Sequence, residues 1–354
     1  MAKQVSKQKK KDNIRKIWIR RSILIFCSLV AGIAVYFAYR VFGPNTRTFV
    51  DKKYFYIRTG SHYTDVLTGL REQDIIRNEK SFDWVAKQLD YPNRVKAGRY
   101  QVTRGMSNFD IVKLLRSGHQ SPVTLVVNKL RTENDFVRKV SMNLEADSAA
   151  LRAILHDPVY LRQFGLDTNT VMCAILPNTY EFYWNTSAET VFEKFEKARN
   201  AFWTDERKAK ASALNLSENE VTILGAIVEE ETNANDEKPL IASVYLNRYR
   251  KGMLLQADPT VKFGLQNFAL RRILSVHTHF DSPYNTYIYK GLPPGPICTP
   301  SVKTLDAVLN TPNTDYLYFC ARADMPGHHA FAATYEEHLQ NARKYHAALD
   351  ARGL

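Results

Sequence analysis

The chain has 354 residues, of which 45% are hydrophobic, and a formal net charge of +13. This length allows one large or two modest cores in addition to a membrane segment. Nine basic residues lie within positions 1–21, and the sequence shows no zinc-finger spacing, RNA-binding aromatic motif or helix-turn-helix signature. We therefore explain most of the charge by membrane topology and expect no nucleic-acid partner.

An apolar run follows the basic segment. Residues 22–39 carry no charge and are long enough to cross a hydrocarbon core, and Tyr36 and Tyr39 suit an interface. We predict a cytoplasmic tail (1–21), a single-pass helix through the cell (inner) membrane (22–42) that contacts its lipid, and a periplasmic or extracellular remainder. A cleaved signal peptide is the alternative, because residues 31–34 are mostly small, but the apolar run continues beyond them.

The segment from 43 to 127 begins with a helix-breaking Gly43-Pro44-Asn45 and then alternates short strands and helices. The pattern predicts strands at 54–57, 98–102 and 123–127, and helices at 61–70, 81–88 and 108–115. This rhythm is typical of a small α+β module.

The remainder, 128–354, is predicted to form a larger α+β domain. Helical periodicity covers 133–140, 148–155, 188–213 and 240–249. Glycines and prolines at 252, 259, 264 and 291–300 predict turns of the kind that the loops of a cleft require.

Three consecutive glutamates end the most apolar helix of this larger domain. Ser217 and Glu220 form a capping-box pattern, and apolar residues fill nearly every position from 221 to 228. At about 100° per residue, Glu230 projects away from the core stripe, while Glu229 and Glu231 lie at its two edges. Partial desolvation at an edge would raise a carboxyl pKa, as a general acid requires.

The same glutamates also have a structural interpretation. Three acidic residues at a helix end are often solvated or paired, here with Lys238, Arg248 or Arg250.

Sequence blocks around and after these glutamates resemble the membrane-bound endolytic murein transglycosylases, the MltG/YceG-like family. The blocks are VEEET (228–232), ASVYLNR (242–248), LQADPTV (255–261), YNTY (284–287), GLPPGPI (291–297) and YLYF (316–319). Upstream, KAGRY (96–100) and DIVKLLRSG (110–118) resemble the family's LysM-like subdomain, and LPNTY (176–180) resembles the entry to its catalytic part. Glu230 departs from the lysine of many relatives, and residues 266–280 match no family pattern.

The resemblance implies a LysM-like subdomain within 43–127 and a catalytic transglycosylase domain at 128–354. It implies a lyase that cleaves the MurNAc–GlcNAc bond inside peptidoglycan strands and leaves 1,6-anhydroMurNAc ends without a cofactor. Glu229 is the catalytic acid by residue-for-residue match, and one carboxyl can serve first as acid and then as base. Placement beside the membrane suggests trimming or termination of nascent strands near peptidoglycan synthases.

Other residues of these blocks are candidate substrate contacts. Amide groups suit sugar hydroxyls, aromatic rings suit sugar faces, and a second carboxylate can bind sugar. The candidates are Asn247, Gln256, Asp258, Tyr284, Asn285, Tyr287 and Glu231. Asp258 could instead cap a turn, Asn285 could form an Asx-turn, and Tyr316, Tyr318 and Phe319 fit a core strand better than a binding platform.

Other functions remain open from the residues alone. A muramidase-type hydrolase would use Asp258 or Glu231 as its second carboxylate, and a non-enzymatic wall-binding scaffold would use the glutamates only structurally. The LysM-like segment could likewise be a spacer.

The histidine and cysteine residues suggest neither a metal site nor a disulfide framework. The histidine pairs at 277/279 and 328/329 lack partners at metal-ligand spacing, so no metal is expected. Cys173, Cys298 and Cys320 are more typical of buried small side chains than of a framework, although one bridge is possible.

Overall fold

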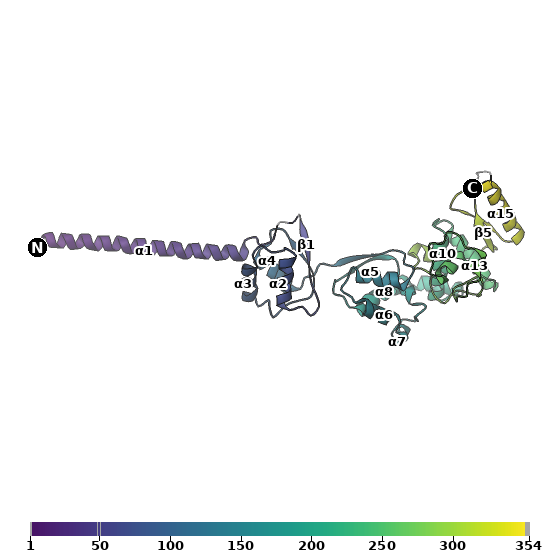
Figure 1. Ribbon diagram of the computed structural model, residues 1–354, viewed down its shortest axis with the longest axis horizontal. Helices are drawn as coiled ribbons and strands as arrows, with labels where there is room; N and C mark the ends of the chain where they lie inside the picture. Colours follow the sequence, from purple (N-terminus) through teal and green to yellow (C-terminus); the bar gives the residue numbers. More distant parts are fainter. Residues whose placement is uncertain (1, 48, 50, 351–354) are drawn as a thin grey trace. The chain divides into compact units, whose positions relative to one another are not determined.

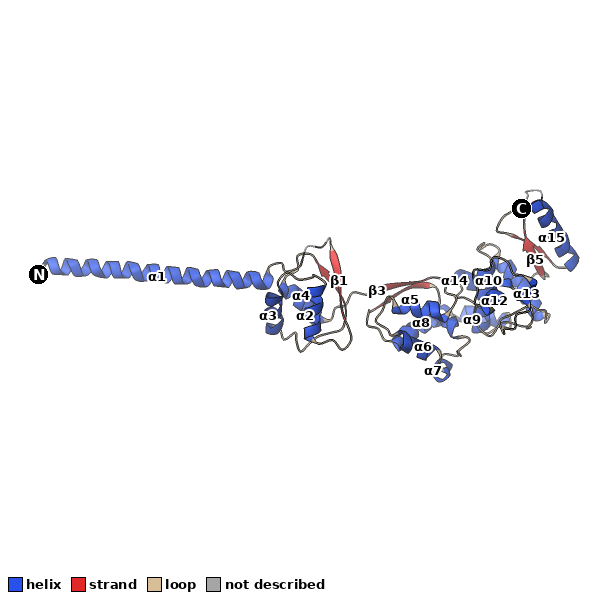
Figure 2. Cartoon of the chain, in the orientation of Figure 1, coloured by secondary structure: helices blue, strands red, loops and turns tan. Residues whose placement is uncertain are grey.

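The computed structural model describes residues 2–47, 49 and 51–350, with side chains from Arg15 onward. It is mixed helix and sheet (Figure 1; Figure 2). The described chain divides into two compact units. The first extends to Pro122 and takes in Tyr183–Asn185, and the second comprises Val123–Phe182 and the chain from Thr186 onward.

Helix α1 spans Ala2–Phe42 and so continues through the segment predicted to be a tail. Its part Arg15–Phe42 is long and apolar enough to cross a membrane, and the side chains from Arg15 to Tyr39 are exposed. A helix of membrane-spanning length therefore lies where the apolar run predicted one.

The first unit contains the strands and helices predicted between residues 54 and 115. Its elements are β1 (Lys52–Ile57), α2 (Tyr63–Glu72), α3 (Glu79–Gln88), β2 (Gly98–Thr103) and α4 (Asn108–Ser117). Strands β1 and β2 are antiparallel, with Lys52 opposite Thr103 and Ile57 opposite Gly98. Alternate residues of β1, including Phe55, enter a core with the helices, as the period of two in a half-buried strand requires.

The second unit is mainly helical. Its elements are β3 (Val123–Val127), α5 (Glu133–Ser141), α6 (Ser148–Leu155), α7 (Pro158–Arg162), η1 (Val171–Ala174), β4 (Asn178–Phe182), α8 (Ala188–Phe202), α9 (Asp205–Ala213), α10 (Glu218–Glu231), α11 (Lys238–Arg250), α12 (Asp258–Gly264), α13 (Ser275–Thr278), α14 (Val302–Leu309), β5 (Tyr318–Ala321), β6 (His329–Ala332) and α15 (Tyr335–Asp350). Strands β3 and β4 pair antiparallel, as do β5 and β6.

Two local predictions differ from the structure. The single helical region expected at 188–213 is broken at Trp203 and Thr204, because the Thr204 side chain caps the new helix α9. Strand β3, placed by sequence at the end of the small subdomain, belongs to the second unit, because its partner β4 comes from later in that unit. A strand's partner is not encoded in its own residues.

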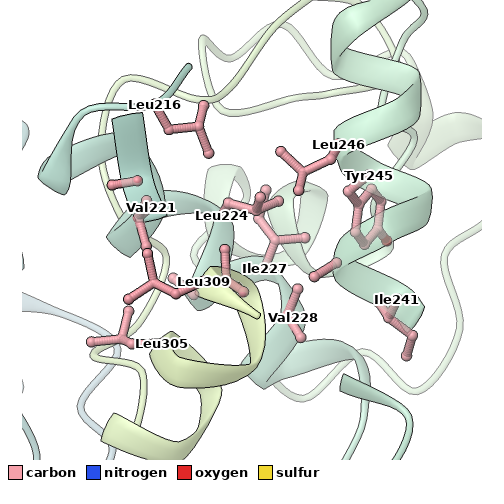
Figure 3. Close-up of a cluster of buried hydrophobic side chains, with 14 of the residues drawn as sticks. Leu216, Val221, Leu224, Ile227, Val228, Ile241, Tyr245, Leu246, Leu305 and Leu309 are labelled. Carbon is pink, nitrogen blue, oxygen red and sulfur yellow. The ribbon is translucent and has the colours of Figure 1, made fainter. Parts of the chain in front are cut away.

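Helix α10 is the centre of the second unit's main core (Figure 3). All eight residues from Val221 to Val228 are buried, which confirms the predicted helix with apolar surroundings on nearly every side. Its apolar side chains pack among those of α11, such as Tyr245, and those of α14, such as Leu305 (Figure 3). The glutamates at 229–231 are the first charged side chains after this buried stretch.

Candidate active site

The three glutamates at the end of α10 have different surroundings. Glu229 accepts hydrogen bonds from the ammonium of Lys238, 3.1 Å away, and from the hydroxyls of Ser301 and Thr304. Burial would raise its pKa, but these hydrogen bonds and the charge of Lys238 outweigh burial and lower the pKa. The raised pKa predicted for Glu229 is therefore wrong, because a buried cation faces this edge of the helix.

Glu230 is also held in a charged network. Two nitrogens of Arg131 donate hydrogen bonds to its carboxylate, the closer at 2.9 Å, and the Lys129 ammonium lies 2.8 Å away. Burial would raise the Glu230 pKa, but the hydrogen bonds and charges of these two cations lower it. The side chain is only 14% exposed, because residues from outside α10 cover the face that the helix angle predicted to be outward.

Glu231 has the surroundings of an acid. Burial and the neighbouring charge of Asp258 raise its pKa to about 7, although a hydrogen bond from Tyr245 and the charge of Lys262 act in the opposite direction. The Tyr245 hydroxyl lies 3.2 Å from the Glu231 carboxyl. A carboxyl with this pKa is about half protonated at neutral pH, so it can donate a proton and later accept one.

Glu231 lines a pocket of about 300 Å³ within the second unit. Three further predicted residues, Gln256, Asp258 and Tyr287, line the same pocket. The Tyr287 hydroxyl donates to the Asp258 carboxylate at 2.6 Å, which fixes both side chains. Tertiary structure thus brings together four of the predicted site residues around one small space.

The backbone at Gln256 is strained. Its φ of +55° is the left-handed conformation that non-glycine residues seldom adopt. The backbone N–H of Gln256 donates to the Thr286 carbonyl at 3.0 Å, and the Gln256 side-chain oxygen accepts from Arg248 at 3.1 Å. Strain maintained by surrounding contacts is characteristic of functional sites, and Gln256 lines this pocket.

Four predicted residues lie outside this pocket. The side-chain amide of Asn247 donates to the Thr314 and Tyr316 carbonyls. That of Asn285 donates to the Thr278 and Phe280 carbonyls, while its side-chain oxygen accepts from the Tyr287 backbone N–H. Asn285 is therefore the Asx-turn residue of the alternative interpretation. Glu229 is the third, in the ion pair described above.

Tyr284 is the fourth, and it lines a separate pocket of the second unit. Its ring packs on Phe263 with centroids 4.6 Å apart.

Asp258 begins α12 rather than capping a turn. Pro259 at the first turn of this short helix supplies a backbone angle suited to helix initiation, so the glycine and proline pattern misled the prediction of a loop.

The pocket also contains residues that the sequence did not indicate as site residues. Arg248 lies over the Tyr318 ring at 5.1 Å, and the ring of His338 stacks on Tyr318 at 5.4 Å. Both rings line the pocket, as does Phe319. The sequence favours Tyr318 and Phe319 as core strand residues. In the structure they are only partly buried, because strand β5 borders the pocket. A site role for Arg248 could have been inferred from its place beside Asn247 in the ASVYLNR block.

The cysteines are free throughout the described part of the chain, with Cys173 and Cys298 buried and Cys320 partly buried. Within that same part, no three histidine, cysteine or acidic side chains are grouped so as to hold a metal ion.

The fold and the pocket define a class of protein: a mixed α+β chain with one apolar N-terminal helix and a carboxylic-acid site bordered by amide and aromatic groups. Such a site suits acid–base chemistry on a polar ring such as a sugar. The sequence matches the YceG-like family over residues 55–344, and the chain belongs to that family.

Similar proteins carry a consistent name. The chain is 28% identical to the endolytic murein transglycosylase of Bacillus subtilis (strain 168), over 82% of this chain and 83% of that protein. It is 26% identical to the endolytic murein transglycosylase of Streptococcus pneumoniae (strain R6), over 92% of this chain but only 64% of the longer relative. The crystal structure of a yceG-like protein from Listeria monocytogenes matches with a TM-score of 0.53 and 28% identity, over 82% of this chain and 98% of that one.

Proposed function

We propose that the chain is an endolytic murein transglycosylase that cleaves the MurNAc–GlcNAc bond within peptidoglycan strands and leaves 1,6-anhydroMurNAc ends. The observation that carries this proposal is Glu231, a carboxyl with a pKa of about 7 in a pocket with Gln256, Asp258 and Tyr287. The relatives named endolytic murein transglycosylase support the same activity.

In the proposed reaction Glu231 first acts as the acid. It gives its proton to the bridging oxygen as the bond from the MurNAc anomeric carbon to that oxygen breaks, and GlcNAc leaves with a free hydroxyl. The resulting carboxylate then takes the proton of the muramic 6-hydroxyl, whose oxygen bonds to the anomeric carbon. Proton and bond counts balance without water, and the negative charge of Asp258, which lines the same pocket, would stabilise an oxocarbenium-like state.

This assignment replaces Glu229 by Glu231 as the acid. Glu229 has a lowered pKa and faces Lys238, Ser301 and Thr304, whereas Glu231 has a raised pKa and faces the pocket. A residue-by-residue resemblance identifies the block of glutamates but does not distinguish their environments.

Mass spectrometry of the products released from purified peptidoglycan tests the proposal. Glu231→Gln should lower anhydro-muropeptide release by 10²- to 10⁴-fold, the usual contribution of general acid–base catalysis. The matched control is Glu229→Gln, two residues away in the same helix, which should keep most of its activity per folded molecule. Full activity of Glu231→Gln together with loss in Glu229→Gln would restore Glu229 as the acid.

A two-carboxylate hydrolase is the second candidate, and Asp258 beside Glu231 is the observation that favours it. A hydrolase would release reducing-end MurNAc products instead of anhydro ends, and Asp258→Asn would abolish product formation as completely as Glu231→Gln. If neither variant changed release, the wall-binding scaffold would be the better description.

The cellular placement follows from the apolar helix and the basic residues before it. We propose that the tail is cytoplasmic and that the catalytic unit lies outside the cytoplasm, where newly made strands and their synthases are located. Release of the catalytic unit from its membrane helix should then lengthen or shorten cellular glycan strands; unchanged strand lengths would argue against this placement. A glycan-binding, LysM-like role for the first unit stays a prediction.

A further inference from the structure

The first unit has a basic pocket that the proposed cleavage does not use. Its volume is about 590 Å³, and it lies between α4 and the segment that follows α3. Four cationic residues line it, Arg94, Lys96, Lys113 and Arg116, and its lining includes no carboxylate. An anion is therefore the ligand that its charge favours.

Two of these cations form no ion pair within the described part of the chain. Arg94 pairs with Asp90 at 2.9 Å, and the Lys96 ammonium donates to the Ser117 carbonyl at 3.0 Å. The ion pairs of the described residues include neither Lys113 nor Arg116, although the charge of Arg116 helps to lower the pKa of the nearby Asp90. These two side chains are thus available to oxygens of a ligand.

The cations and an aromatic ring lie on one face of α4. Phe109, Lys113 and Arg116 are spaced i, i+4 and i+7, and all three line the pocket. At 1.5 Å per residue, the two cations lie roughly 6 and 10 Å along the helix from Phe109. Val95 and Leu89 add further apolar lining. The pocket therefore combines apolar contacts near Phe109 with positive charge farther along α4.

The apolar part of the pocket adjoins the end of the membrane-spanning helix. The ring of Phe109 contacts that of Phe42, the last residue of α1, with centroids 5.5 Å apart. The neighbouring Asn108 side chain donates to the Arg40 carbonyl at 2.8 Å. These contacts within one unit hold α4 at the point where the apolar span Arg15–Phe42 ends.

We propose that this pocket binds the phosphate of an anionic membrane lipid. Lys113 and Arg116 contact the phosphate oxygens, for which a guanidinium provides paired donors, and Phe109 contacts the adjoining apolar part of the lipid. A membrane lipid is favoured over free phosphate because Phe109 adjoins the helix end and the lining is partly apolar. Bound lipid would fix the first unit against the membrane surface.

Native mass spectrometry of the full chain in detergent micelles tests this site with defined lipids. The probes are dioleoyl phosphatidylglycerol, neutral-headgroup dioleoyl phosphatidylcholine, and glycerol phosphate without acyl chains. The variant Lys113→Gln/Arg116→Gln removes the two free cations. The control Lys80→Gln/Arg104→Gln removes the same charge from exposed residues of the first unit outside the pocket.

We expect the pocket variant to bind phosphatidylglycerol roughly 30-fold more weakly, since each basic residue near an anionic lipid contributes about fivefold. The control variant should bind phosphatidylglycerol as the wild type does, and glycerol phosphate should bind weakly to all three proteins. Equal binding by the two variants, or equal binding of glycerol phosphate and the lipid, would overturn the proposal. If the pocket variant unfolds, Lys113→Arg/Arg116→Lys should retain binding.

The pocket variant should still release anhydro-ended products from purified peptidoglycan, because its substitutions lie in the other unit from Glu231 and leave the proton-transferring groups intact. Failure of the lipid site and failure of the proposed enzymatic function are therefore separable.

Discussion

The raised pKa of Glu231 leads to a pH dependence. Its carboxyl is protonated below about pH 7 and ionised above it, so the acid form is lost as pH rises. We expect the rate of anhydro-muropeptide release to fall about tenfold per pH unit on the alkaline side of that value. A pH–rate profile of the wild type measures this limb; a flat profile from pH 6 to 9 would contradict the assignment.

The conservative variant Tyr245→Phe tests the same alkaline part of the pH–rate profile. The Tyr245 hydroxyl stabilises the ionised form of Glu231, so its removal should raise the pKa further and move the alkaline limb to higher pH. Glu231→Gln should remove the limb together with the activity.

Glu229 makes a different contribution, to stability. It lies in a buried pair with Lys238, whose side chain is only 5% exposed. Glu229→Gln leaves that ammonium without a counter-charge but keeps a hydrogen-bond acceptor, so we expect a loss of about 1–3 kcal/mol in the free energy of unfolding.

The difference in the free energy of unfolding between wild type and Glu229→Gln should depend on pH in a defined direction. The Glu229 pKa in the folded state lies below its ordinary value of 4.5, so the stabilisation is fully present above about pH 4.5 and is lost as pH falls through the folded-state pKa. Urea unfolding of wild type and variant at pH 7 and pH 3 should show a smaller difference in the free energy of unfolding at the lower pH. An equal difference at the two pH values would mean that the charge pair contributes little to stability.

At the scale of elements, α10 and α14 approach closely at Gly225. A Cβ atom there would meet a Leu305 methyl at 3.0 Å and Pro300 at 3.6 Å. Gly225→Val should therefore lower stability by about 1–3 kcal/mol through overpacking, despite the poor helix propensity of glycine. Thermal unfolding of the variant measures this loss.

Adding Leu305→Ala should lower stability by less than the sum of the two single losses, because it removes the methyl that the new side chain contacts. If the two stability losses were strictly additive, the contact between positions 225 and 305 would not limit the packing of α10 on α14.

At the scale of the whole molecule, the apolar span of α1 determines how the chain is retained. The full chain should stay in the membrane pellet after washes with high salt and alkaline buffer, since about 20 apolar residues hold a helix by burial rather than by charge. A chain that begins at Val35 should be released, while keeping the packing of Phe37 on Trp84 and of Phe42 on Phe109. Cell fractionation and immunoblotting measure both.

Two other results would contradict an uncleaved membrane helix. Release of the full chain by salt alone would mean that its basic residues hold it peripherally. A mature N-terminus near Ala34 would mean that the segment is a cleaved signal peptide.

Much of the fold follows from local sequence because its signals are local. The capping box at Ser217 and Glu220 begins α10, and the unbroken apolar stretch after it confirms a helix buried on nearly every side. The period of two in β1 and the uncharged run of α1 are equally local. In contrast, Tyr335–Asp350 and Val302–Leu309 form helices that the sequence analysis did not predict.

The sequence by itself determined that a block of glutamates ends a buried helix and that the chain resembles one family. Only the tertiary structure decided how the three carboxyls differ, because Lys238 and Thr304 lower one pKa, Arg131 lowers the second, and burial near Asp258 raises the third. Helical angles give the direction of a side chain. Its pKa depends on charges and solvent exclusion supplied by residues up to 99 positions away.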